Sequence, residues 1–448
     1  MDIANNGWVQ NSVFALISAI LGASCVRRFF GWLRKKVALW YSRELRSSDF
    51  VDFSNEVLLL YYADIRQDFV TFEDVRLPVA TILAAENVPY PFDSLCIPYS
   101  QTELIGQSGR RCYGCSWRGL VYRYLVGNGI RRGWLQGFML DKAHVDGAGR
   151  VIGVSCRDGT YSDNVYSSHI LEFEMFMAYR RWRGRTNGVA RACRAMPLRN
   201  AIQVACGSAG AVQNGEGRAS LLGVQMLVAA RDKSGGYSLL RITRSSSVAA
   251  SCGLHQFVPS GGFEVFDKIE QSEGESLDAE ELKRHYSIRN AVFREYAEEL
   301  FGRCDFELGD GEDPCRKVDE DADVKHLVGL LREGKAKMVY LGNVIGLMSL
   351  RQELSFVLII DDVQYLNSSA FKTNEEGRGH VHKIPFAEVE SGANPIDSRR
   401  ALEKWCADSV GLWHLLKRSK WYQFLRDGES LARAEEDKTP RYEKRIAS

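Results

Sequence analysis

The chain lacks a net charge of one sign, a regular cysteine framework and a second long apolar segment. Its 448 residues include 58 Lys and Arg against 57 Asp and Glu, which gives a formal net charge of +1. This balance gives no indication of general nucleic-acid binding. The 11 cysteines are scattered, which excludes a disulfide scaffold and is typical of a reducing compartment. A single apolar run also excludes a polytopic membrane protein.

The one long uncharged segment lies near the amino terminus, at residues 8–26. Its length is close to the roughly 20 residues that a helix needs to cross a bilayer. Residues 27–46 then carry seven Lys or Arg and one Glu, as on the cytoplasmic side of a span. We therefore predict a membrane anchor over residues 1–46, with one pass and the carboxy-terminal bulk in the cytoplasm. The alternative is a buried or interfacial amphipathic helix.

The rest of the chain divides where the residue pattern changes. Residues 51–205 predict a mixed α/β region without an assignable role, in which the segment 77–88 looks helical or core-like. A small-residue stretch at about 205–220 marks a boundary. Residues 217–390 predict a strand-rich domain with helices, and residues 396–448 predict a helical tail.

A predicted helix from about residue 287 to 301 carries closely spaced acids. Glu295, Glu298 and Glu299 lie three or four positions apart, so their carboxylates converge on one side of the helix. They border the apolar face instead of opposing it, which indicates a site where the helix meets a sheet. Carboxylate oxygens suit Mg²⁺ or Mn²⁺. The planar fork of Arg294 can hold the acids in place.

These residues resemble the Nudix box. The segment R-E-Y-A-E-E matches the REUxEE core of the box, in which U is aliphatic, and a preceding glycine pair matches its opening. The matching residues are Gly261, Gly262, Arg294, Glu295, Glu298 and Glu299.

The resemblance implies a fold, a metal and a reaction. The fold is a Nudix-like α/β/α sandwich with a mixed sheet. The metal is Mg²⁺ or Mn²⁺, held by the three glutamates and by a backbone carbonyl at Gly261. The reaction is hydrolysis of a nucleoside diphosphate linked to another moiety, with Arg294 and the glutamates as the catalytic group. The proton acceptor is one of these glutamates or a loop acid such as Glu375 or Glu376.

The sequence departs from the Nudix box in several places. The loop between Gly262 and Arg294 is much longer than usual, and Tyr286 stands where the box has an acid. Glu275, in a GESL stretch, is a displaced candidate for that acid. Tyr296 replaces the aliphatic residue, and the closing glycine, Gly302, comes one position late. Because of these changes, the resemblance does not identify the substrate.

Three weaker patterns have structural explanations. Cys112 and Cys115 form one CxxC, but a zinc site needs two more ligands. His380 and His382 form an HxH that an edge strand explains equally well. The acidic run at residues 305–323 is typical of a solvated loop. A salt-bridged helix is the corresponding alternative for the REYAEE segment.

The prediction is a membrane-anchored, metal-dependent Nudix-like hydrolase. Its expected partners are a nucleotide or nucleotide derivative, the membrane through residues 8–26, and a second copy of the chain in a homo-oligomer. Two alternatives stay open. One is a nucleotide-sensing membrane effector, because the organisation resembles Nudix effectors of bacterial cyclic-oligonucleotide antiphage systems. The other is a non-catalytic scaffold.

Overall fold

The structure is a computed structural model of the chain. It describes residues 32, 36–37, 39–41, 43–65, 67–85, 122, 135–245, 253–265, 282–283, 285–303, 314–369, 371–372, 380–391 and 396–432.

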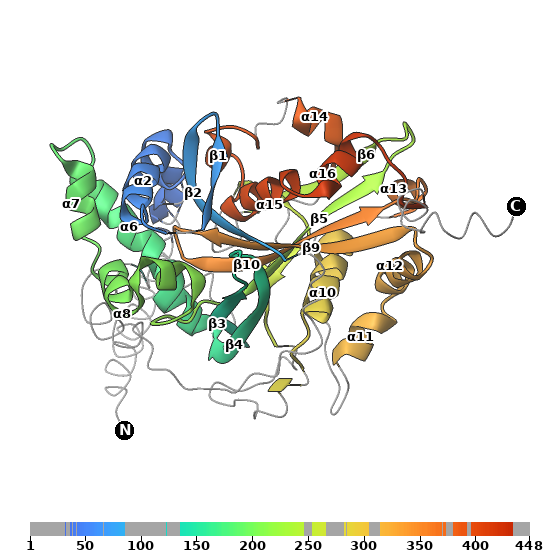
Figure 1. Cartoon of the computed structure of the whole chain (residues 1–448), viewed down its shortest axis with the longest axis horizontal. Helices are drawn as coiled ribbons and strands as arrows, with labels where there is room; N and C mark the ends of the chain where they lie inside the picture. Colours follow the sequence, from blue (N-terminus) through green and yellow to red (C-terminus); the bar gives the residue numbers. More distant parts are fainter. Residues whose placement is uncertain are drawn as a thin grey trace, which may run out of the picture.

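Strands and helices are interspersed along the described chain (Figure 1). The strands are β1 (Asp68–Phe72), β2 (Val75–Leu83), β3 (Gln136–Val145), β4 (Val151–Thr160), β5 (Gly223–Arg231), β6 (Tyr237–Thr243), β7 (His255–Phe257), β8 (Ser260–Gly262), β9 (Ala336–Gly346), β10 (Arg351–Ile360) and β11 (His382–Pro385). The α-helices are α2 (Ser48–Tyr61), α5 (Tyr161–Asn164), α6 (Ile170–Trp182), α7 (Gly188–Arg194), α8 (Pro197–Gln213), α10 (Ile288–Phe301), α11 (Pro314–Glu320), α12 (Ala322–Arg332), α13 (Tyr365–Ser368), α14 (Phe386–Glu390), α15 (Ala407–Lys417) and α16 (Lys420–Arg426). A π-helical segment, η2 (Val165–His169), precedes α6, and a 3-10 turn, η3 (Ala401–Glu403), precedes α15.

The described strands form one large mixed sheet and one ribbon. The sheet runs in the order β1-β2-β9-β10-β5-β6-β11, with β8 paired to β5 and β7 paired to β6. Strands β10 and β5 are parallel, whereas β9 and β10 are antiparallel. The ribbon consists of β3 and β4. A mixed sheet was predicted, and this part of the fold prediction is confirmed.

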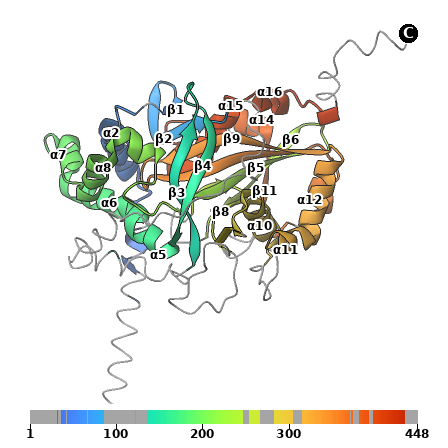
Figure 2. The same cartoon turned by 60° about the horizontal axis from the view of Figure 1, so that its bottom comes forward.

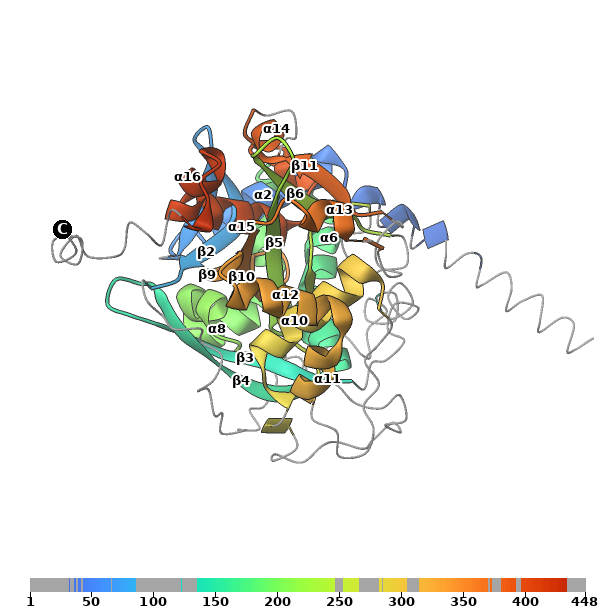
Figure 3. The ribbon, with the colours of Figure 1, turned by 90° about the vertical axis from the view of Figure 1, so that its right-hand side faces the viewer.

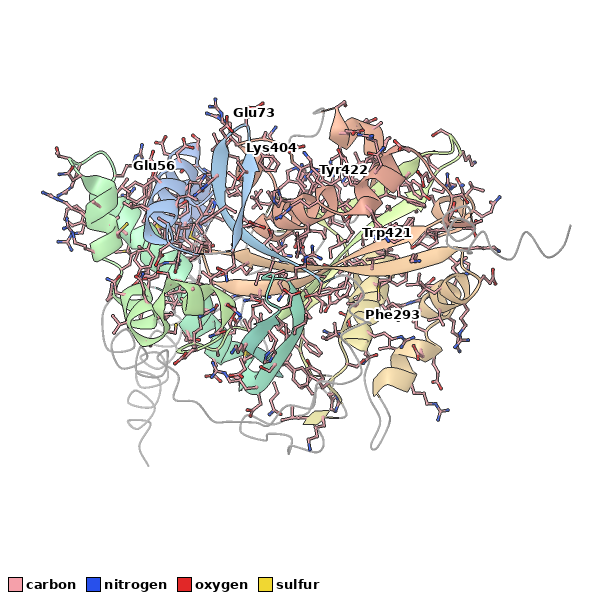
Figure 4. The ribbon with its side chains drawn as sticks, viewed as in Figure 1. Glu56, Glu73, Phe293, Lys404, Trp421 and Tyr422 are labelled. Atoms are coloured by element: carbon pink, nitrogen blue, oxygen red, sulfur yellow. The ribbon has the colours of Figure 1, made fainter. Side chains whose placement is uncertain are left out.

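Helices cover both faces of the large sheet. Helices α14, α15 and α16 lie on one face, and α10 and α12 lie on the other (Figures 1 and 3). Alternate residues of β10 follow this division, because Val357 packs with Trp413 of α15 while Phe356 lies in the core that includes Tyr296 of α10. Figure 4 shows Phe293 of α10 on the opposite side of the sheet from Trp421 of α16.

The segment 77–88 includes a strand where the sequence pattern looked helical. Residues Val75–Leu83 form β2, which pairs with β9 from Val79 to Leu83. β-Branched side chains such as Thr81 and Ile82 favour the extended backbone. The helix predicted at 287–301 is confirmed, since α10 spans Ile288–Phe301.

Residues from 51–205 and 217–390 share one sheet and one core. Strands β1 and β2 extend the sheet beyond β9. The β3–β4 ribbon lies on the same side of the sheet as α10 (Figures 1 and 3). The backbone of Phe138 in β3 bonds to Phe263 and to Leu222, at 2.9 Å in both cases. The β3–β4 ribbon therefore borders the segment that leads from β8 toward α10.

The prediction of a transmembrane helix, and with it a single-pass membrane protein, is wrong for the part of the chain that the structure describes. No helix there is long and apolar enough to cross a bilayer. The longest, α8, has 17 residues and is interrupted at Gly207, whereas a span needs about 20. Residues 8–26 themselves lie outside the described residues.

Candidate active site

Helix α10 has defined ends. The hydroxyl of Ser287 accepts the backbone N–H of Asn290 at 3.2 Å, as an N-cap does. At the other end Gly302 has a φ of 63° and its N–H bonds back to the carbonyl of Glu298 at 3.0 Å. Glycine takes this left-handed conformation without steric cost. The late closing glycine of the sequence pattern is therefore the C-cap of the helix.

Gly261 lies directly against the carboxylate of Glu295. A Cβ atom built on Gly261 would lie 2.1 Å from Cδ of Glu295 and 2.2 and 2.3 Å from its two oxygens. Gly261 is held there because it pairs with Val224 in the sheet. A side chain at position 261 would displace the Glu295 carboxylate from the strand, so the first glycine of the motif permits this close approach.

Arg294 links the helix to the second glycine. Its Nη2 donates to the carbonyl of Gly262 at 3.0 Å and to Oε1 of Glu295 at 2.9 Å. The Arg294 and Glu295 side chains are only 11% and 10% exposed, so solvent screens this pair weakly. Arg294 therefore fixes the Glu295 carboxylate against β8.

The other two glutamates have different surroundings. Oε2 of Glu299 accepts the backbone N–H of Ser260 in β8 at 2.6 Å, and Glu299 is buried. Glu298 is half-buried. The structure thus brings Glu295 and Glu299 to the backbone of β8, while Glu298 lies closer to solvent.

The carboxylates fit a divalent cation by chemistry, but they do not form an assembled centre. Three acids on one helix beside a glycine strand supply hard oxygen ligands. Among the described residues, however, no three His, Cys, Asp or Glu side chains are arranged to hold a metal ion. Glu295 is directed toward Arg294, and Glu299 is directed toward Ser260. The assignment of all three glutamates and Gly261 as ligands stays a prediction.

Two departures from the Nudix box are positions of core packing. Tyr296 is fully buried, and its hydroxyl lies 2.8 Å from the hydroxyl of Tyr365. Tyr286 packs between Phe138 and Phe263, with ring centroids 5.0 and 5.1 Å away. An aromatic residue at 286 therefore fills the space beside β3 and supplies no carboxylate.

A second polar cluster lies on the opposite face of the sheet, beside the same end of β5. Glu353 of β10 pairs with Gly223 of β5, which in turn pairs with Gly262. A Cβ atom on Gly223 would lie 1.5 Å from Oε2 of Glu353. Arg351 lies 3.1 Å from the other Glu353 oxygen. The pKa of Glu353 is raised to about 8, mainly by burial; Arg351 opposes this shift, and the carboxylate of Asp408 contributes to it.

The sequence analysis missed Glu353, Arg351 and Asp408. One signal was present, since Glu353 is a carboxylate in a strand, R-Q-E-L-S-F-V-L-I-I, whose second half is apolar and buried. A charged residue in a buried strand requires a partner or a function. Nothing in the local sequence indicates that Asp408, on α15, lies near it.

The structure describes only some of the remaining candidate residues from the sequence analysis. Cys112, Cys115, Glu275, Glu375 and Glu376 lie outside the described residues. His382 begins β11, which is at the edge of the sheet and pairs with β6. This placement confirms the edge-strand explanation of the HxH motif.

Comparisons with known proteins give a weak similarity to a solved structure. No family model matches the chain, and no curated protein matches it. Among solved structures the chain is similar to a NUDIX hydrolase from Alicyclobacillus acidocaldarius, with 11% identity and a TM-score of 0.21. The match covers 45% of this chain and 96% of that chain. A similarity of this strength carries no argument about the fold or the reaction.

Proposed function

We propose that this chain is a Nudix-like hydrolase that cleaves a phosphoric anhydride bond in a nucleoside diphosphate linked to another moiety. One observation carries the proposal: Glu295 lies against Gly261 and is held there by Arg294, which also binds the carbonyl of Gly262. A merely solvated helix face would not bury two glutamates, nor would it require a glycine on the facing strand.

The proposed reaction adds water to phosphorus and breaks the bridging P–O bond. The proton of the water passes to a carboxylate, and one of the α10 glutamates is suited to accept it. Arg294 keeps Glu295 in a single orientation, so little reorganisation is needed as charge develops. When bound by Glu295, Glu298 and Glu299, Mg²⁺ or Mn²⁺ would neutralise the diphosphate oxygens and lower the pKa of the attacking water.

The test uses the full chain with magnesium and a panel of substrates. The panel contains nucleotide sugars, dinucleoside polyphosphates and nucleoside diphosphate derivatives, and both binding and product release are recorded. Glu295→Gln should abolish product while substrate affinity stays within about tenfold, because most of the charged site remains. Glu388→Gln, at an exposed position of α14, is the matched control and should leave turnover unchanged.

A nucleotide-binding protein without turnover is the second candidate. It is favoured by Tyr286, which packs among aromatic rings where the Nudix box has an acid. The lack of an assembled three-ligand centre in the described residues also favours it. Tight nucleotide binding without product, with affinity unchanged in Glu295→Gln, would establish this candidate and overturn the hydrolase.

A further inference from the structure

The segment that joins α6 to α7 concentrates positive charge. Residues 180–194 contain six arginines and no acidic residue. The chain as a whole carries a net charge of only +1, so this concentration is a local feature that composition conceals. Figures 1 and 2 show α7 at the opposite end of the molecule from α12, far from the candidate active site.

Two of the six arginines are neutralised by acids near α2. Arg183 forms an ion pair with Asp49. Arg180 lies 3.9 Å from Glu44 and also lies over the ring of Trp40, 5.4 Å from its centroid. These two arginines fasten α6 to the preceding helical segment, and this contact explains their presence.

The other four arginines have no such partners among the residues that the structure describes. Arg181, Arg185 and Arg191 lie over the ring of Trp182, with guanidinium carbons 5.0, 5.7 and 5.4 Å from its centroid. Arg194 follows at the end of α7. All four are exposed, and within the described part of the chain none forms an ion pair with a carboxylate. We call these four residues the arginine patch.

The geometry around Trp182 gathers like charges into a small area. From their distances to one centroid, the three guanidinium carbons lie within about 11 Å of one another. Cation–π attraction holds each guanidinium near the ring, and each guanidinium has several N–H donors that a ligand can accept. The positive charges of the three guanidinium groups repel one another, and a bound polyanion would reduce this repulsion.

We propose that the arginine patch binds the phosphate backbone of a nucleic acid. Phosphates follow one another along a strand every 3.4 Å or so of helix axis, so several can face a patch of this size. The guanidinium fork matches two phosphate oxygens at once. Backbone contacts of this kind are independent of base sequence. The inference does not depend on the proposed hydrolase.

The experiment measures binding of the full chain to a single-stranded RNA oligonucleotide by fluorescence anisotropy at several salt concentrations. Four phosphate contacts predict a slope of log K against log salt of about −3. In the triple variant Arg181→Gln, Arg185→Gln, Arg191→Gln the affinity should fall at least tenfold and the slope should become shallower by about 2. The control is Arg76→Gln, because Arg76 is also exposed and its guanidinium carbon lies over an aromatic ring, 5.5 Å from the centroid of Phe69.

Three outcomes would overturn the proposal. One is no RNA binding by the parent chain at low salt. Another is equal binding by the triple variant and the Arg76 control. The third is binding of polyglutamate as tight as that of RNA, which would assign the patch to an acidic protein. If the triple variant fails to fold, the single reversals Arg185→Glu and Arg191→Glu carry the same expectation.

Discussion

At the scale of single residues, the three glutamates of α10 are chemically equal and structurally different. Glu299 accepts a backbone N–H of β8 and is buried, whereas Glu298 is half-buried. A hydrogen bond to a carboxylate is stronger than one to a neutral oxygen. The same substitution should therefore have unequal effects on folding at these two positions.

We expect Glu299→Gln to lower the free energy of unfolding by about 1 kcal/mol, because the amide oxygen still accepts the Ser260 N–H but without charge. Glu298→Gln should change it by less than about 0.5 kcal/mol. Both variants should bind Mg²⁺ or Mn²⁺ more weakly than the parent. Urea unfolding and calorimetric metal titration measure the two effects. Unchanged metal affinity in both variants would mean that the acids are only a charged helix face.

Glu353 predicts a pH dependence of stability. Burial raises its pKa from 4.5 to about 8, so between these values the folded chain holds a proton that the unfolded chain has released. The free energy of unfolding should therefore fall as the pH rises from about 4.5 to about 8. The neighbouring charges are Arg351 and Arg244, which oppose the shift, and Asp408, which adds to it.

Glu353→Gln should remove this part of the pH dependence, because a neutral amide takes the place of the carboxyl. The variant should melt at a higher temperature than the parent at about pH 9, and the difference should shrink toward about pH 5. Thermal melts across this range measure it. Glu388→Gln, at an exposed position, should follow the parent curve. A Glu353 variant that also followed the parent curve would contradict the assignment.

At the scale of elements, the carboxy-terminal end of α10 depends on the glycine that caps it. The residue after the helix, Gly302, has a φ of 63°, and a Cβ atom there would lie 3.0 Å from the carbonyl oxygen of Lys372. The backbone N–H of Lys372 in turn bonds to the carbonyl of Leu300 at 2.8 Å. The end of α10 and the segment at Lys372 therefore stabilise each other. They meet at Gly302, where the backbone conformation is unstrained only for glycine.

Gly302→Ala should lower the free energy of unfolding by about 1 kcal/mol, because alanine is strained in the left-handed region. Hydrogen exchange should show faster opening of the last turn of α10, which carries Glu298 and Glu299. Gly147→Ala is the control, since nothing lies within 4 Å of a Cβ atom there. Equal stability of parent and Gly302→Ala would argue against the cap.

At the scale of the whole molecule, a buried arginine of α8 connects this helix to the large sheet through hydrogen bonds. Arg199 of α8 is buried and donates to the carbonyl of Leu347 at 2.8 Å and also to the carbonyl of Met348. These carbonyls belong to the turn between β9 and β10. The same arginine donates to the hydroxyl of Tyr62 at 3.0 Å. Residues far apart in sequence thus satisfy one another's buried polar groups.

A fragment of residues 217–390 should not fold alone. It would lose β1 and β2 from the sheet edge, Arg199 from the β9–β10 turn, and α15 from one sheet face. We expect no cooperative transition in urea for this fragment. Residues 32–432, which span the described residues, should unfold cooperatively with the midpoint of the full chain. A cooperative transition in the short fragment would show that 217–390 is an independent domain.

Local sequence determined the features that depend on neighbouring residues. The spacing of Glu295, Glu298 and Glu299 places them on one side of a helix because of helical periodicity, and Ser287 and Gly302 delimit that helix through backbone conformation. The apolar runs of β9 and β10 likewise predict strands. Such features arise within a few residues, so the sequence alone sufficed.

Tertiary structure alone decided which groups meet across the sheet. That Tyr286 packs on Phe138, that Glu353 lies over Gly223, and that β2 pairs with β9 all follow from strand order, which local patterns do not encode. The sequence showed the glycine pair as a motif, but it did not show why glycine is found at these positions. Only the approach of α10 to β8 shows what Gly261 does: the Glu295 carboxylate occupies the space that a side chain at position 261 would take.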